Sequence, residues 1–141
     1  MWYYRNELIE EIPDGYYGFV YCIHNLSKNK RYIGKKQFYS AKSKMVKGKK
    51  KRIMVPSDWL VYTGSNADLN RDILEGDEIR KEILHLCKMK SEMSYLETYL
   101  IFMNHALISD VYYNHWVTCK ITEYHLNKTR DGIVESLSES G

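Results

Sequence analysis

Aromatic and β-branched residues give the clearest structural signal in the chain, a predicted β-hairpin near its N-terminus. Residues 16–24 are aromatic or β-branched almost throughout, which is typical of a strand. The polar residues 25–29 fit a short loop, and residues 30–35 fit the returning strand. Residues 36–57 are basic and poor in apolar positions, so we expect an irregular segment there. Before the hairpin, residues 1–14 form only a short lead-in.

The second half of the chain predicts two helices with a strand between them. Ser65 or Asn66 can cap a helix that runs to about residue 75. Apolar and polar positions alternate in part over residues 80–87, which favours a strand. A helix is the alternative there, because most of these residues also favour helix. Over residues 91–104 the apolar positions recur at helical spacing, so we expect a second helix.

These elements indicate an α+β fold, in which a small, mostly antiparallel sheet of three strands is flanked by helices and a basic insertion follows the first hairpin. The chain has 141 residues, which is the length of a single domain. We expect its core at about residues 16–116 and the insertion at about residues 37–62. A polar C-terminal tail is expected from about residue 126.

The composition favours a protein that works in the cytoplasm. Apolar residues make up 44% of the chain, which is enough for a small core. No apolar run approaches the roughly 18–20 residues that span a bilayer, and the N-terminus lacks the apolar segment of a signal peptide. The three cysteines are odd in number and lack metal-ligand spacing, which favours a reducing compartment. We therefore expect a cytoplasmic protein without a membrane partner.

The distribution of charge points to a polyanionic partner, although the net charge is only +3. Between Gly15 and Ser57 there is no Asp or Glu, and the same stretch holds twelve of the 21 Lys and Arg residues. Such a segment repels itself unless it meets a polyanion, most commonly a phosphate backbone. A solvated loop that happens to be basic and a nuclear localisation signal at residues 49–52 are the alternatives. The expected phosphate contacts are Lys35, Lys36, Lys42, Lys44, Lys47, Lys49, Lys50, Lys51 and Arg52.

Two of the thirteen tyrosines stand out because of their neighbours. Tyr21 ends the tripeptide Phe-Val-Tyr, and Tyr32, eleven residues later on the adjacent predicted strand, begins the tripeptide Tyr-Ile-Gly. Further along, Glu97 begins the sequence Glu-Thr-Tyr-Leu-Ile on the second predicted helix. Asn114 follows two tyrosines and lies seventeen residues after Glu97.

These four landmarks, in this order and at these spacings, resemble the GIY-YIG nuclease family over roughly residues 16–116. The second half of the family's first motif, Tyr-Ile-Gly, is present letter for letter. The first half departs from the family pattern, because Phe19 and Val20 stand where the family has glycine and isoleucine. The departure leaves in place the tyrosine that would take part in the chemistry.

The resemblance implies a single metal ion held by Glu97. A glutamate is a hard oxygen ligand suited to Mg²⁺ (or Mn²⁺), which binds through one or two carboxylates together with water and phosphate. The alternative for Glu97 is an ordinary exposed helix glutamate. Asn114 would hold either the backbone or a phosphate, and the alternative for Asn114 is a turn-forming asparagine.

The resemblance also implies roles for the two tyrosines. Tyr21 would be the general base, and its pKa, ordinarily near ~10, must then be lowered by nearby cations. Lys35 and Lys36, shortly after the second motif, are expected to supply that field. Tyr32 would orient water or a phosphate oxygen by hydrogen bonding. The alternative for both tyrosines is simple packing in the sheet.

The family further carries an arginine that grips the scissile phosphate, and its equivalent in this chain stays open. Arg71 takes this role if the first predicted helix corresponds to the family's helix. Lys36 would act instead as a point charge, without the bidentate fork of an arginine. Lys35, Lys42 and Arg52 are the other candidates.

The sequence therefore predicts a Mg²⁺-dependent DNA endonuclease that resembles the short, stand-alone enzymes of phages or mobile elements, including homing endonucleases. If a phage encodes it, the host cytoplasm is its compartment. Specificity would be low, or would come from the basic insertion, a homodimer or a partner protein. The rival interpretation is a non-catalytic nucleic-acid-binding module, and a nuclease acting on RNA is a third.

Overall fold

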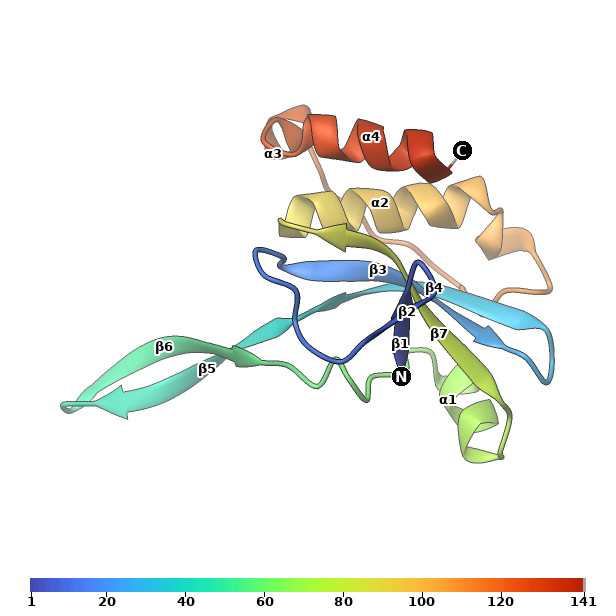
Figure 1. Ribbon diagram of the computed structural model, residues 1–141, viewed down its shortest axis with the longest axis horizontal. Helices are drawn as coiled ribbons and strands as arrows, with labels where there is room; N and C mark the ends of the chain where they lie inside the picture. The colour runs from blue at the N-terminus through green and yellow to red at the C-terminus, as the bar shows by residue number, and fades with distance from the viewer. Residues whose placement is uncertain (141) are drawn as a thin grey trace.

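A five-stranded sheet forms the centre of the molecule in the computed structural model, which describes the backbone of residues 1–140 and the side chains of residues 1–138 (Figure 1). The strand order is β2-β1-β7-β3-β4, and only β1 and β7 run parallel. The strands are β1 (Trp2–Tyr4), β2 (Glu7–Ile9), β3 (Gly18–Asn25), β4 (Lys30–Gln37) and β7 (Ile79–Cys87). The α+β class, the β3–β4 hairpin and the strand near residue 80 are confirmed. The sheet is mixed and has five strands, so the prediction of three was wrong.

The two extra strands come from residues 1–14, which had been expected to form only a lead-in. β1 and β2 have three residues each, too few to show any periodicity. β1 is held by pairing with residues 81–83, far away in the sequence, and by the fully buried Trp2. The Trp2 ring lies edge-on to Phe19 and Tyr21, with centroids 4.9 and 5.1 Å apart. Long-range packing rather than local preference therefore creates these strands.

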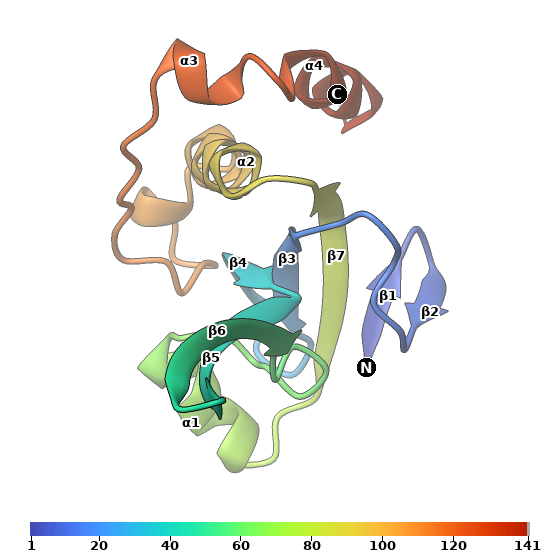
Figure 2. The same ribbon diagram turned by 90° about the vertical axis from the view of Figure 1, so that its left-hand side faces the viewer.

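Helices cover both faces of the sheet (Figure 2). On one face lies α2 (Lys90–Met103), and α4 (Arg130–Ser140) lies over α2 with Ile133 buried in the same apolar cluster. Near the other face lies α1 (Ala67–Leu74), whose N-cap Asn66 accepts a 3.0 Å hydrogen bond from the Leu69 backbone N–H. Both predicted helices are confirmed. The remaining helical turns are α3 (Glu123–Leu126) and the 3-10 turn Ala106–Ile108.

The side chains of β3 alternate between two apolar cores. Phe19, Tyr21 and Ile23 face the core that contains Trp59, whereas Val20 faces the core beneath α2. β4 is one of the two edge strands of the sheet, opposite β2. The site described below lies at this edge, where both faces of the sheet can be reached. No helix within residues 1–140 has the length and apolar character needed to cross a membrane.

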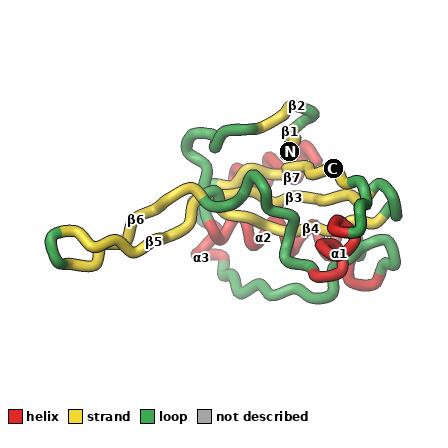
Figure 3. The backbone as a smooth tube through the Cα atoms, turned by 90° about the horizontal axis from the view of Figure 1, so that it is seen from below, coloured by secondary structure: helices red, strands yellow, loops and turns green. Residues whose placement is uncertain are grey.

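Residues 36–57 are not irregular, as expected, but form a regular hairpin that projects from the body of the molecule (Figures 1 and 3). β5 (Tyr39–Val46) and β6 (Lys49–Pro56) pair over eight residues each. The turn between them is Lys47-Gly48, with positive φ at both residues, as a two-residue type I′ hairpin turn requires. Almost all side chains of these strands are exposed, so the strands lack the apolar–polar alternation of a half-buried strand. The basic, polar composition was therefore mistaken for irregular structure.

Candidate active site

The edge of β4 is closed by the segment that contains Asn114. The Arg31 N–H donates to the Val111 carbonyl at 2.8 Å, and the Tyr113 N–H donates to the Arg31 carbonyl at 2.7 Å. The Asn114 side chain then continues this pattern, donating to the Ile33 carbonyl at 2.8 Å and accepting from the Ile33 N–H at 3.1 Å. Asn114 is buried, so the amide acts as a substitute for one more residue of a neighbouring strand.

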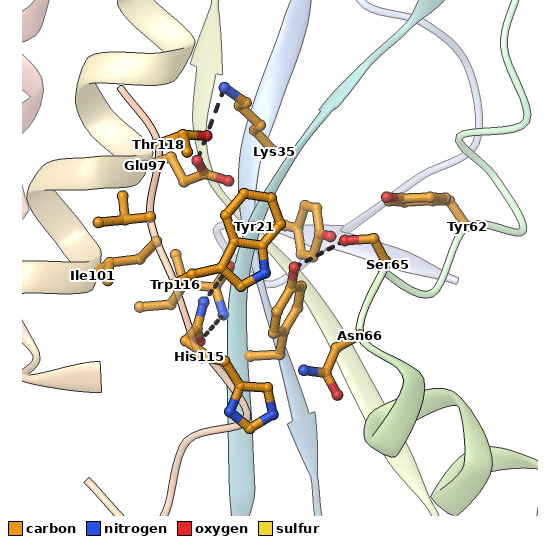
Figure 4. A pocket seen from close by; sticks show the side chains of 14 residues that line it. Tyr21, Lys35, Tyr62, Ser65, Asn66, Glu97, Ile101, His115, Trp116 and Thr118 are labelled. Carbon is orange, nitrogen blue, oxygen red and sulfur yellow. Dashed lines mark hydrogen bonds and ion pairs between the residues drawn. The ribbon is translucent and has the colours of Figure 1, made fainter. Parts of the chain in front are cut away.

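A cavity of about 300 Å³ opens beyond the Asn114 contact, at the meeting point of β3, β4, α2, the loop 57–66 and the segment 114–118 (Figure 4). All four landmark residues line it together: Tyr21, Tyr32, Glu97 and Asn114. The other lining residues are Ile33, Lys35, Tyr62, Ser65, Asn66, Ile101, His115, Trp116, Val117 and Thr118.

Tyr21 lies almost fully buried in the floor of the cavity. Its side chain is packed by Trp2 and Phe19, and the Tyr62 ring lies edge-on beside it. The ring lies across Gly34, where an added Cβ would approach Tyr21 Cζ to 2.5 Å. A side chain at residue 34 would therefore displace Tyr21. This contact gives a physical reason for a glycine at the end of the Tyr-Ile-Gly motif.

Tyr32 and Tyr62 complete a cluster of three phenol rings. The Tyr21 ring centroid lies 6.2 Å from that of Tyr32 and 6.1 Å from that of Tyr62. The Tyr32 hydroxyl hydrogen-bonds with Ser65 Oγ at 3.2 Å. Gly64, with φ of +82°, lets the chain turn tightly against the Tyr32 ring, because a Cβ there would lie 3.1 Å from it.

Sequence reasoning missed Tyr62, which reaches the cavity from the loop 57–66. Two buried groups hold this loop against the sheet. The Trp2 indole N–H donates to the Trp59 carbonyl at 2.6 Å, and Lys81 Nζ donates to the carbonyls of Leu60 and Tyr62 at 3.1 and 2.8 Å. Burial lowers the pKa of Lys81 to about 8. No local pattern marks Tyr62, because β1 and β7 determine its position.

Glu97 presents a half-buried carboxylate to the cavity from α2. The closest cation is Lys35, whose Nζ lies 3.9 Å from Glu97 Oε1 and donates to Ser94 Oγ at 2.9 Å. Burial raises the pKa of Glu97, and the ammonium of Lys35 opposes that shift only in part. The negative charge of Glu97 is thus only partly balanced by a nearby cation. Carboxylates with perturbed pKa values of this kind are common at functional sites.

The electrostatics around Tyr21 differ from the sequence expectation. Burial raises the pKa of Tyr21 well above its ordinary value, and the neighbouring Tyr62, Tyr32 and Glu97 raise it further. The expected lowering of this pKa by lysines was wrong for the protein alone, because Lys35 lies near Glu97 rather than beside the phenol. Burial also raises the pKa of Tyr32.

The structure places the other predicted cations outside the cavity. Lys36 pairs with Asp58 at 2.6 Å and lies 4.1 Å from the centroid of the Tyr62 ring, and it is not one of the lining residues. Arg71 is exposed and pairs with Asp68 at 3.3 Å. The cations from Lys42 to Arg52 lie on the projecting hairpin or its turn. Lys35 is thus the only Lys or Arg among the described lining residues.

The donor set of the cavity suits a metal ion that binds mainly through water and phosphate. Glu97 is the only carboxylate among its described lining residues, and no cluster of three or more His, Cys, Asp or Glu occurs in the described chain. One carboxylate with neighbouring hydroxyl oxygens fits Mg²⁺ or Mn²⁺ and does not fit the closed, multi-ligand sites typical of structural Zn²⁺.

Comparison with known proteins defines the class. Residues 2–117 match the family model described as "Putative endonuclease segE, GIY-YIG domain". Because the match covers most of the chain, the protein belongs to the GIY-YIG family, and it is an endonuclease that hydrolyses phosphodiester bonds. No curated protein and no solved structure matched the chain. The family resemblance drawn from the four landmarks is confirmed.

Proposed function

We propose that this protein is a Mg²⁺-dependent DNA endonuclease whose reaction takes place in the cavity of Tyr21, Tyr32 and Glu97. The observation that carries the proposal is that three residues from three different elements, β3, β4 and α2, converge on one cavity. Nucleases of this family generally use a divalent metal. The proposal assigns that metal to Glu97 and the proton transfer to Tyr21.

Glu97 would hold the metal through its carboxylate oxygens, with water and a phosphate oxygen completing the coordination. When bound, a divalent cation neutralises phosphate charge and makes nearby hydroxyls more acidic. The raised pKa of Glu97 means that the protein alone carries a site that lacks positive charge. Lys35, at 3.9 Å, is close enough to share the phosphate without replacing the metal.

Tyr21 would accept a proton from the attacking water. In the protein alone its phenol keeps its own proton at neutral pH, because burial and the neighbouring tyrosines raise its pKa. The reaction therefore needs positive charge to enter the cavity, so that the phenol first loses its own proton to solvent and can then act as a base. In the protein alone Tyr62 favours the protonated Tyr21. Once Tyr21 is ionised, the Tyr62 hydroxyl would turn to donate to the phenolate.

Tyr32, Lys35 and Asn114 would position the substrate. The Tyr32 hydroxyl, already paired with Ser65, can donate to a phosphate oxygen. Lys35 would stabilise the charge that develops on the phosphate in the transition state. Asn114 is committed to the Ile33 backbone, so its role would be to hold β4 and the segment 114–118 in place. The roles predicted for Lys36 and Arg71 stay predictions and require DNA to bring these residues to the site.

The β5–β6 hairpin would hold the DNA backbone. Residues opposite one another in a hairpin share a face, so Lys42, Lys44, Lys49 and Lys51 lie on one face, and Lys50 and Arg52 lie on the other. A two-stranded ribbon fits the major groove of B-DNA, where its lysines can reach phosphates. Eight residues of strand extend roughly 26 Å, so the hairpin can contact DNA well away from the cut.

A plasmid assay tests the proposal. Supercoiled DNA is incubated with Mg²⁺ or Mn²⁺ and the wild-type protein, Glu97→Gln or Tyr21→Phe. We expect nicking by the wild type, none by Glu97→Gln, and a loss of about 100-fold or more for Tyr21→Phe. Glu135→Gln and Tyr124→Phe change exposed residues outside the cavity and should cleave normally.

Two outcomes would contradict the proposal. DNA binding without nicking in either metal would show that the protein is a non-catalytic nucleic-acid-binding module. Cleavage of RNA but not of DNA under the same conditions would show that the substrate is RNA.

A further inference from the structure

We propose that Trp116 stacks on a nucleobase next to the phosphate that is cut, so that the cavity recognises a base as well as a phosphodiester. This inference rests on the proposed function, because it requires nucleic acid in the cavity. It concerns a side chain that none of the roles above uses.

Trp116 differs sharply from the other two tryptophans of the chain. Trp2 and Trp59 are 0% and 2% exposed and belong to the core, whereas Trp116 is 71% exposed. Its indole takes part in no aromatic pair, cation–π contact or hydrogen bond with the part of the chain that the structure describes. Packing therefore does not account for so large an aromatic group at this position.

The position of Trp116 is nevertheless fixed by its neighbours in the chain. Tyr113 is buried, and its hydroxyl donates to Asp72 at 2.6 Å. Asn114 is fixed by its two hydrogen bonds to Ile33. Trp116 follows only two residues later. The indole thus makes no hydrogen bond and no aromatic or cation–π contact with the described residues, but it is attached to a firmly held segment that lines the cavity.

The cavity has two chemically different sides. The phenols and Ser65 provide hydroxyl groups, whereas Ile101, Val117 and Trp116 provide apolar surface. Figure 4 shows the indole in front of Tyr21 along the line of view, and both residues line the same cavity. A nucleotide has the same two parts, an anionic phosphate and a flat aromatic base. With the phosphate at the hydroxyl side, the adjoining base can reach the indole.

A base within a duplex is already stacked between its neighbours. The indole can therefore reach a base only where the base is unpaired or where a neighbour is displaced, and displacement is easiest at a mismatch or in a single strand. We accordingly expect the indole to contact single-stranded or mismatched DNA more readily than a perfect duplex. Every base has a flat face, so this contact favours an accessible base rather than a particular sequence.

Tryptophan fluorescence tests the contact directly, because Trp116 is the one exposed indole. The wild-type protein is titrated in EDTA, which keeps the DNA intact, with a single-stranded oligodeoxynucleotide, a mismatched duplex and a perfect duplex. A fourth probe is an oligomer of the same length and charge that lacks all bases. Binding is followed independently by the anisotropy of a fluorescein label on each probe.

We expect strong quenching of the indole by the single strand, less by the perfect duplex and little by the oligomer without bases. Trp116→Phe should bind almost as tightly but lose the quenching, since the remaining tryptophans are buried. Trp116→Ala and Trp116→Leu should both bind the single strand about tenfold more weakly, because an aliphatic side chain cannot stack. Thermal melting of each variant should stay close to the wild type, because the residue is exposed.

The outcomes separate this inference from the proposed function. DNA that binds and is nicked in Mg²⁺ without any change in indole emission overturns the stacking and leaves the endonuclease intact. Equal quenching by the oligomer without bases also overturns it, because the contact would then be with the phosphate backbone. A protein that neither binds nor nicks DNA overturns both.

Discussion

At the scale of single residues, the site combines groups that are costly to bury with groups that hold them there. Glu97 keeps a carboxylate in a half-buried position with only Lys35 nearby, at 3.9 Å. Tyr21 keeps a phenol whose ionised form is disfavoured until positive charge arrives. The ionised forms of Glu97 and Tyr21 are therefore unfavourable in the absence of ligand, so the site lowers the stability of the fold in order to carry out its function.

Glu97→Gln should therefore stabilise the metal-free protein while abolishing cleavage. Because the folded pKa of Glu97 is raised, its protonated form stabilises the fold at low pH, and that contribution is lost as pH rises through the folded pKa. Denaturant unfolding in EDTA should show a higher free energy of unfolding for Glu97→Gln at pH 7, and the difference should shrink toward pH 4. Glu135→Gln, at an exposed site, should show no such difference. A Glu97→Gln protein less stable than the wild type at pH 7 would contradict this account.

Lys35 controls the proton affinity of Glu97, and so it should control the acid side of the pH–activity profile. Lys35→Gln removes the charge that lowers the pKa of Glu97, so that this pKa rises further. As the pH falls, Lys35→Gln should therefore lose its nicking activity at a higher pH than the wild type does. The rate of nicking between pH 5 and pH 8, at saturating Mg²⁺, measures the shift. Lys36→Gln, the adjacent lysine that pairs with Asp58, should leave the acid limb unmoved.

At the scale of elements, the loop 57–66 lines the cavity together with the sheet and α2. It carries Tyr62 and Ser65 and is held by hydrogen bonds from Trp2 and Lys81 rather than by regular structure. A loop placed by two buried side chains can be loosened without unfolding the sheet. Its contribution to catalysis is therefore separable from the stability of the fold.

Tyr62→Phe removes the hydroxyl that would donate to the Tyr21 phenolate from the neighbouring ring, and it should slow nicking by about 10-fold, the effect of one hydrogen bond to a charged group. Lys81→Met, which frees the carbonyls of Leu60 and Tyr62, should slow nicking with little change in DNA affinity. If Lys81 acts through Tyr62, the double variant should be no slower than the slower single variant. Full additivity of the two losses in single-turnover rates would show that the residues act independently.

The β5–β6 hairpin carries unequal charge on its two faces. Lys44 and Lys51 are direct cross-strand partners, an arrangement that destabilises an isolated hairpin. Replacing both by serine should weaken DNA binding and reduce the slope of log affinity against log salt by roughly 2. Lys50→Ser with Arg52→Ser removes the same charge from the opposite face and should reduce the slope less. Equal slopes for the two pairs, measured by fluorescence anisotropy, would mean that the hairpin does not present one face to DNA.

At the scale of the whole molecule, local patterns could be predicted from the sequence and long-range placement could not. β3, β4, α1 and α2 follow from periodicity and caps within each segment. β1 and β2 depend on pairing with β7, so their three-residue segments show no pattern of their own. The same division holds in the site. Tyr21, Tyr32, Glu97 and Asn114 follow from ordered motifs, whereas Tyr62 and Trp116 reach the cavity only because distant contacts direct their segments there.

The described residues of each chain form one such cavity, and this number determines whether one or both strands of a duplex are cut at a time. A single site cleaves one strand at a time, and a simultaneous break needs a second copy positioned on the other strand. With supercoiled plasmid in excess over protein, we expect open circles to accumulate first and linear DNA to appear later, with an initial rate proportional to protein concentration. Light scattering of the protein at the same concentration supplies the control for self-association. Direct conversion of supercoiled to linear DNA, with a rate that rises as the square of protein concentration, would instead show that two copies assemble on the DNA before either one cuts.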